Sequence, residues 1–148
     1  MYFYDKYGKL WHHENAQNTG GNSDFRDYST KGYLNRVVRD NLGNTYRYGL
    51  HLDGVGANRF YVTYDLNRIY SSFSGTCILP YEMRTTSDTK YFEIFCDGIL
   101  VFTSNTMQRG CSSQTFEIDV TGVKYLTIQY PATKGSNETA VLCDGLLS

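Results

Sequence analysis

The fold class is decided by the stretch Phe92-Glu93-Ile94-Phe95-Cys96-Asp97-Gly98-Ile99-Leu100-Val101-Phe102. Two runs rich in β-branched and aromatic residues flank Asp97-Gly98, a dipeptide that tolerates the positive φ angles of a two-residue hairpin turn. Residues 115–120 then alternate apolar and polar side chains, and Thr121-Gly122 turns the chain into a further apolar-rich run over 123–130. Consecutive antiparallel strands of this kind predict an all-β fold, an antiparallel sandwich or barrel. Such folds usually bind ligands through their loops.

Strand signals continue on both sides of this region. Short alternating runs bounded by Gly, Asn and Asp predict further strands over 33–39, 45–51, 59–65, 69–79 and 139–144. The segments between them predict a turn over 40–44 and loops over 53–58 and 80–88. Residues 1–32 are polar and rich in Gly and Asn, so we expect one or two short strands there and long loops, one of them at 18–22.

The length and regularity of the chain predict one domain. A chain of 148 residues can bury a core without disulfides or metal, and this sequence has no internal repeat. We expect a single domain over 1–148, with a loop-rich part at 1–32 and a strand core at 33–146. Period-two alternation predicts that the side chains facing the interior include Phe60, Val62, Phe92, Ile94, Phe116, Ile118, Leu126 and Ile128.

The composition excludes several classes of partner. The net charge is −1 and both signs are interspersed, so neither nucleic acid nor a membrane surface is an expected partner. No apolar run approaches the roughly 20 residues that span a bilayer. The start of the chain lacks the basic and apolar regions of a secretory signal, which is consistent with a module of a larger protein. We expect the module to be monomeric.

The four cysteines predict packing rather than chemistry. Cys77, Cys96, Cys111 and Cys143 include no pair at the short spacing of a zinc site or a redox centre. Cys77 and Cys96 share the strand phase of apolar neighbours and are expected to be small buried hydrophobic residues. Cys111 is expected in a loop. An even count permits disulfides, but nothing in the sequence requires one.

Enzyme motifs are absent from the sequence. It contains no Gly-x-Ser-x-Gly elbow, no P-loop, no His-Glu-x-x-His motif and no dinucleotide fingerprint. No carboxylate pair stands out by its spacing. We therefore expect no catalytic residues, and we place a small stand-alone enzyme last among the possible functions.

A spaced set of motifs resembles one family of modules. In chain order the set is Asn44-Thr45-Tyr46, Gly49-Leu50, Tyr64-Asp65-Leu66, Tyr70 to Gly75, Asp97-Gly98, Ser104, Asp119 to Val123 and Leu126. It resembles the NPCBM family of carbohydrate-binding modules, which is similar to the family fifty-one carbohydrate-binding modules. The resemblance implies a galactose-binding-like jelly roll that binds terminal galactose-type sugars. It also implies a module appended to a glycoside hydrolase or a surface protein, and so an extracellular or cell-surface location.

Recognition of a neutral sugar needs an aromatic face and side chains that bond hydroxyl groups. The candidate contacts are His51, Asp53, Asn58, Arg59, Glu82 and Arg84, with Trp11 and Tyr81 as candidate aromatic platforms. The loops around His51 and Glu82 differ from those of family members. A second hypothesis is therefore an interaction or architectural module of the same fold that does not bind sugar.

Metal binding is expected only by analogy with the family. His12 and His13 are adjacent, so on a strand they point to opposite faces and do not share an ion easily. Many galactose-binding-like folds hold a structural calcium ion, which prefers oxygen ligands. The resemblance implies that backbone carbonyls together with a carboxylate such as Asp144 or Glu138 would hold calcium here.

Overall fold

The computed structural model describes the backbone of residues 16–20, 23–27, 38–46, 49–54, 59–131 and 140–148. Side chains are described for 38–46, 63–129 and 140–148. Within these residues every strand pairing is antiparallel, and the only helix is a single 3-10 turn, η2 (Tyr81–Met83). No helix in this part of the chain is long and apolar enough to cross a membrane.

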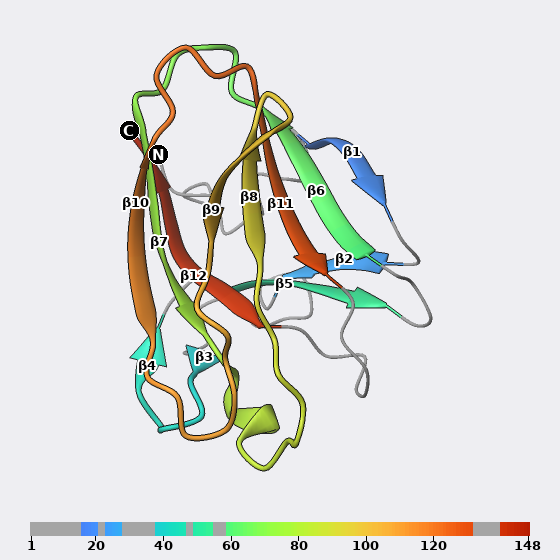
Figure 1. Ribbon diagram of the computed structural model, residues 1–148, viewed down its shortest axis with the longest axis vertical. Coiled ribbons are helices and arrows are strands. Elements are labelled where there is room, and N and C mark those ends of the chain that lie inside the picture. Colours follow the sequence, from blue (N-terminus) through green and yellow to red (C-terminus); the bar gives the residue numbers. More distant parts are fainter. Residues whose placement is uncertain (1–15, 21–22, 28–37, 47–48, 55–58, 132–139) are drawn as a thin grey trace.

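Two five-stranded sheets pack face to face (Figure 1). The first sheet contains, in spatial order, β1 (Ala16–Gly20), β6 (Arg59–Asp65), β11 (Tyr125–Pro131), β8 (Glu93–Cys96) and β9 (Ile99–Thr103). The second contains β10 (Gln114–Asp119), β7 (Ser72–Ile78), β12 (Val141–Leu147), β5 (Gly49–Gly54) and β2 (Ser23–Asp27). A small hairpin joins β3 (Val38–Arg39) to β4 (Thr45–Tyr46). The predicted all-β antiparallel sandwich is confirmed.

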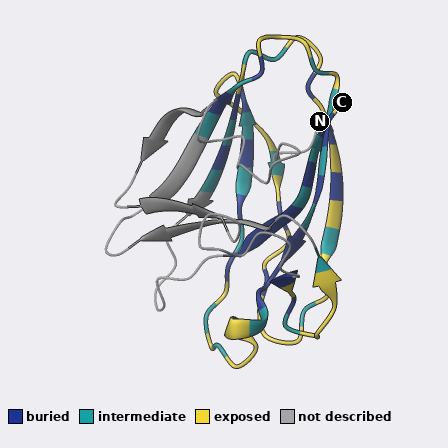
Figure 2. Cartoon of the chain, turned by 180° about the vertical axis from the view of Figure 1, so that it is seen from behind, coloured by how far each residue is buried: buried dark blue, intermediate teal, exposed yellow. Residues whose placement is uncertain are grey.

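Buried residues lie along strands of both sheets (Figure 2), and most of their apolar side chains form one core cluster. Six of the predicted interior residues are buried as expected: Phe92, Ile94, Phe116, Ile118, Leu126 and Ile128. The exposed Glu117 and Asp119 alternate with Phe116 and Ile118 along β10, as period two requires. The side chains of Phe60 and Val62 lie outside the described residues.

The hairpin between β8 and β9 has the predicted two-residue turn. Asp97 has φ 49° and Gly98 has φ 80°, so both turn residues are left-handed. This is the geometry that matches the right-handed twist of two antiparallel strands. The Asp97 carboxylate also accepts bonds from the backbone N–H groups of Lys124 at 3.3 Å and Tyr125 at 2.9 Å, which ties the turn to β11.

The turn at Thr121-Gly122 does not join two neighbouring strands of one sheet. β10 pairs with β7, whereas β11 pairs with β6 and β8, so the turn carries the chain from one sheet to the other. The prediction that β10 and β11 are paired consecutive strands is therefore wrong. Both strands bury alternate residues between the sheets, and alternation does not reveal whether two strands share a sheet or face each other across the core.

Several predicted boundaries also differ from the structure. Residues 18–20 were predicted as a loop but lie in β1, an edge strand that pairs with β6. An edge strand pairs on one side only, and it need not show an apolar alternation. The predicted loop over 53–58 begins later, because β5 continues through Asp53 to Gly54 and pairs with β2.

The predicted strand over 69–79 begins only at Ser72. Asn67 and Arg68 have φ 51° and 59°, and the Ile69 N–H donates to the Leu66 carbonyl at 3.2 Å, which closes a tight turn. Ile69 is left exposed after this turn. Of the predicted strand over 33–39, the structure describes only Val38 and Arg39 as β3.

We expect Gly98→Ala to destabilise the domain by about 1 kcal/mol, because an alanine resists a positive φ angle. No atom lies within 4 Å of the position that the added Cβ would take, so the cost is one of backbone conformation. Chemical denaturation measures the change. Gly98→Asn is the matched control and should lose less, because asparagine tolerates the left-handed region. An unchanged stability in Gly98→Ala would show that the turn type is wrong.

All four cysteines are free thiols in the structure, and Cys77, Cys96 and Cys143 are buried. Burial raises the pKa of each of these three thiols. Cys111 lies half-buried in the loop between β9 and β10. The prediction that Cys77 and Cys96 are packing residues is confirmed.

We expect a thiol reagent to label Cys111 first in the native protein, since reactivity needs access and the thiolate form. Denatured protein should show four thiols, and reductant should barely change the melting temperature. The native label should disappear in Cys111→Ser. Mass spectrometry that finds only two free thiols after denaturation would overturn this prediction.

Candidate functional site

The loops of the sandwich gather at two ends (Figure 1). The upper end consists of the turns at 66–71, 97–98 and 120–124, and the lower end consists of residues 40–44, 79–92 and 104–113. The two ends differ in how their charged side chains are used.

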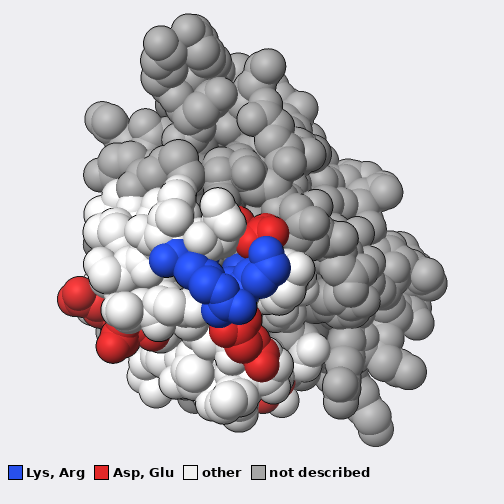
Figure 3. Space-filling view, turned by 90° about the horizontal axis from the view of Figure 1, so that it is seen from above, with Lys and Arg blue, Asp and Glu red and all other residues white. Residues whose placement is uncertain are grey.

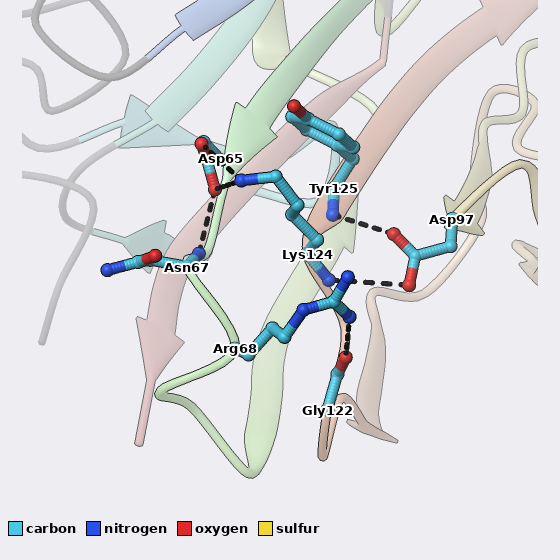
Figure 4. Close-up of polar contacts among 7 residues, drawn as sticks. All are labelled: Asp65, Asn67, Arg68, Asp97, Gly122, Lys124 and Tyr125. Atoms are coloured by element: carbon cyan, nitrogen blue, oxygen red, sulfur yellow. Dashed lines mark hydrogen bonds and ion pairs between the residues drawn. The ribbon is translucent and has the colours of Figure 1, made fainter.

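At the upper end, charged groups bond to one another and to the backbone (Figure 4). Lys124 Nζ lies 3.1 Å from Asp65 Oδ2, and the Asn67 N–H donates to Asp65 Oδ1 at 2.8 Å. The bond from the Asn67 N–H is the main cause that holds the pKa of Asp65 below its usual value, and the bond from Lys124 adds to it. The same bond to Asp65 raises the pKa of Lys124. The Arg68 guanidinium donates to the Gly122 carbonyl at 2.8 Å.

The view from above shows the resulting charge pattern as Lys and Arg atoms flanked by carboxylates (Figure 3). These bonds connect the β6–β7 turn, the β8–β9 turn and the β10–β11 turn to one another. The upper-end charges are thus largely paired within the protein. We assign them a structural role.

At the lower end, the Asp40 carboxylate organises the turn between β3 and β4. Asp40 is 1% exposed. Its oxygens accept from the backbone N–H groups of Leu42 at 3.0 Å and Asn44 at 2.9 Å. They also accept from the Asn44 side chain and from the Tyr46 hydroxyl, each at 3.1 Å. Desolvation is the main cause that raises the pKa of Tyr46, so its hydroxyl remains a donor.

The next residue, Asn41, links this turn to two other lower-end segments. Its backbone N–H donates to the Leu79 carbonyl at 2.8 Å, and its Nδ2 donates to the Cys111 carbonyl at 3.0 Å. Its Oδ1 accepts from the Gly110 N–H. Hydrogen bonds from Asn41 therefore connect three segments of the lower end, the β3–β4 turn, the chain at Leu79 and the loop at 110–111, into one platform.

Three of the predicted site residues come together on this platform. Tyr81 and Glu82 lie in η2, and Arg84 follows directly and donates to the Tyr81 carbonyl at 3.0 Å. Glu82 and Arg84 are exposed. The guanidinium carbons of Arg39 and Arg84 each lie 4.1 Å from the centroid of the Tyr81 ring. The ring thus supports two arginines, and a sugar that stacked on it would have to displace one of them.

Arg39 was not predicted as a site residue. It ends β3, and a lone arginine in a strand gives no signal of its position in space. Of the remaining candidates, His51 and Asp53 lie in β5 and Arg59 begins β6, with their side chains outside the described residues. Trp11 and Asn58 lie outside the described residues altogether.

Calcium binding through Asp144 or Glu138 stays a prediction. Asp144 lies in β12 with φ 54°, where the pairing register with β7 is irregular between Cys143 and Leu146. Glu138 lies outside the described residues. Among the residues with described side chains, no three His, Cys, Asp or Glu gather to hold a metal ion.

Solved structures of carbohydrate-binding modules share this fold. One is the CBM51-2 and INT domains of Clostridium perfringens ZmpB in complex with GlcNAc, with a TM-score of 0.71 at 14% identity. A second is the CBM51 from Clostridium perfringens GH95 in complex with methyl-galactose, with a TM-score of 0.69 at 16% identity. A third is the tandem CBM51 modules of Sp3GH98, a family 98 glycoside hydrolase from Streptococcus pneumoniae, with a TM-score of 0.64 at 16% identity.

The coverage of these matches shows that the chain corresponds to one module. The first match covers 90% of this chain and 29% of the ZmpB chain, and the third covers 88% of this chain and 40% of the Sp3GH98 chain. The second match covers 90% of this chain and 94% of the GH95 module. No curated protein sequence matches the chain.

The fold is that of a β-sandwich module, and the class, a carbohydrate-binding module without catalytic activity, follows from the family. The family follows from the sequence. A sequence model of the NPCBM/NEW2 domain matches residues 13–144, and the chain belongs to this family. The predicted resemblance is confirmed, and the module is not an enzyme.

We expect Asp40→Ala to destabilise the domain by about 1–3 kcal/mol, because it removes the buried acceptor of four partly buried hydrogen bonds. Denaturant titration measures the loss. The matched control is Asp119→Ala, since Asp119 is an exposed carboxylate that accepts from a turn N–H, that of Thr121, at 2.9 Å. The control should lose less. Equal losses in the two variants would contradict the central position of Asp40.

Proposed function

We propose that this module binds terminal galactose-type sugars of glycans through its lower end. It would do so as one part of a larger glycoside hydrolase or surface protein that works outside the cell or on its surface. The complex of the Clostridium perfringens GH95 module with methyl-galactose supports the choice of sugar, because this chain and that module correspond over nearly their whole length.

The observation that carries the proposal is the proximity of Glu82 and Arg84 at the lower end, where hydrogen bonds connect the segments. Both side chains are exposed, and they lie within one turn of chain on a segment that hydrogen bonds hold to the core. An arginine donates to sugar hydroxyl groups and a carboxylate accepts from them, with the stronger bonds that charged partners make. A rigid platform also reduces the entropy that binding must overcome.

The remaining contacts would come from the predicted 51–59 segment and from Trp11. Because two guanidinium groups occupy the Tyr81 ring, we assign the aromatic platform for the sugar to Trp11. His51, Asp53, Asn58 and Arg59 would supply further hydrogen bonds. The family carries this part of the proposal, since these side chains lie outside the described residues.

One observation favours the second candidate, an interaction module without sugar binding. β9 is the outermost strand of its sheet, and Ile99, Leu100 and Val101 are 69%, 47% and 44% exposed. An apolar edge strand suits pairing with a strand of another protein.

We expect methyl-galactose to bind with an affinity of about 10 μM to 1 mM, because a shallow site buries few ligand atoms. NMR titration should shift resonances of residues 80–88. Glu82→Ala and Arg84→Ala should abolish the shifts without lowering the melting temperature. The controls Glu117→Ala on β10 and Arg68→Ala at the upper end should leave binding intact.

N-acetylgalactosamine, galactose-ended oligosaccharides and GlcNAc serve as comparison ligands in the same titration. A preference for GlcNAc would overturn the galactose assignment. If no resonance shifts at millimolar concentrations of any of these sugars, the interaction module replaces the lectin-like module. Repeating the titration and the thermal melt after chelation tests the calcium prediction separately.

A further inference from the structure

Two positively charged side chains share one aromatic ring at the lower end. Arg39 reaches the Tyr81 ring from β3, and Arg84 reaches it from the residue that follows η2. Since both guanidinium carbons lie 4.1 Å from the same ring centroid, they can be no farther apart than twice that distance. A guanidinium that stacks on a ring still presents its N–H groups at its edge.

No carboxylate neutralises this pair within the described part of the chain. The ion pair that the structure shows there joins Lys124 to Asp65 at the other end of the sandwich. Asp40 is the acidic neighbour of Arg39 in sequence, but its oxygens accept bonds from its own turn and from Tyr46. Glu82 is exposed and forms no ion pair with Arg84. Neither guanidinium group is therefore held in an ion pair by a described carboxylate, and both can still bind an external anion.

Most N–H donors of the two guanidinium groups are not used in hydrogen bonds within the described residues. Arg84 gives one N–H to the Tyr81 carbonyl, and within the residues described Arg39 gives none to a protein acceptor. The backbone that carries them is held in place. The Met83 N–H donates to the Pro80 carbonyl at 2.9 Å, and the Arg84 N–H donates to the Tyr81 carbonyl at 3.1 Å. An isolated antiparallel β-bridge between Asp40 and Pro80 connects this segment to the β3–β4 turn.

We propose that the Arg39–Tyr81–Arg84 stack binds an anionic group, a carboxylate or a sulfate, carried by the glycan. The planar guanidinium matches two oxygens of such a group, and a nearby second positive charge adds to the attraction. The Tyr81 hydroxyl supplies a further donor at the edge of the ring. This inference rests on the proposed function and narrows its ligand to acidic, galactose-type glycans.

The test compares methyl-galactose with the methyl glycoside of galacturonic acid, which carries a free carboxylate and differs only at carbon 6. Galactose 6-sulfate is added to distinguish a carboxylate from a sulfate. The parent chain should bind at least one of the two acidic sugars about tenfold more tightly than methyl-galactose at low salt. This advantage should shrink as salt rises from about 20 mM to about 500 mM, because the site is exposed to solvent. Thermal melts confirm that each variant is folded.

The variants distinguish binding of the acidic group by the Arg39–Tyr81–Arg84 stack from attraction by any positive charge on the protein. The acidic advantage should be lost in Arg39→Ala and kept in Arg68→Ala, an exposed arginine at the opposite end. Arg84→Ala should abolish the binding of both classes of sugar, because the proposed function also uses Arg84. Arg39→Ala is the more specific variant, because the proposed function gives Arg39 no contact with a neutral sugar. Its binding of methyl-galactose should stay unchanged.

The outcomes distinguish this inference from the proposed function. Equal affinity for neutral and acidic sugars, or an acidic advantage that survives in Arg39→Ala, overturns the inference and leaves galactose binding intact. Inorganic sulfate that binds as tightly as galactose 6-sulfate overturns it too, since the sugar would then contribute nothing. If neither class of sugar binds, both proposals fail.

Discussion

The packing of Phe116 against Gly75 is the contact on which the sandwich depends. The two residues are paired across β10 and β7, and a Cβ at residue 75 would lie 3.0 Å from Phe116 Cζ and 3.3 Å from the Cys143 carbonyl oxygen. The ring therefore lies where only a glycine leaves room for it. From there it contacts Phe73 of its own sheet with ring centroids 5.4 Å apart and Phe102 of the opposite sheet at 5.0 Å. One aromatic cluster thus joins the two sheets.

This core lies between the sheets, and the two ends of the sandwich lie outside it and differ in how they use charged side chains. The upper end uses its charged side chains to connect three turns, and most of those side chains have partners within the protein. The lower end places its stabilising bonds on the buried Asp40 and on Asn41 and leaves Arg39, Glu82 and Arg84 at the surface. Under the proposed function, stability and recognition would be carried by neighbouring but different residues. We therefore expect surface substitutions at the lower end to change binding without unfolding the domain.

The sequence predicted the parts of the fold that depend on local geometry. The Asp97-Gly98 hairpin follows from the φ angles of two residues, and the six buried positions from 92 to 128 follow from a period of two. Prediction failed where the outcome depends on contacts distant in sequence. Alternation in β10 and β11 is the same whether the strands pair or face each other, and the left-handed turn at Asn67 and Arg68 contains no glycine to mark it.

The candidate site shows the same limit. Residue types and loops predicted Tyr81, Glu82 and Arg84 as neighbours because they lie within one turn of chain. Arg39 was missed because the β3–β4 turn that brings it to Tyr81 is organised by a buried carboxylate, and burial cannot be read from a lone aspartate. The solved modules retain the fold at 14–16% identity, so the fold tolerates wide change in sequence. If the lower end binds the ligand as we propose, ligand preference would depend on surface residues such as Arg39 rather than on the shared fold.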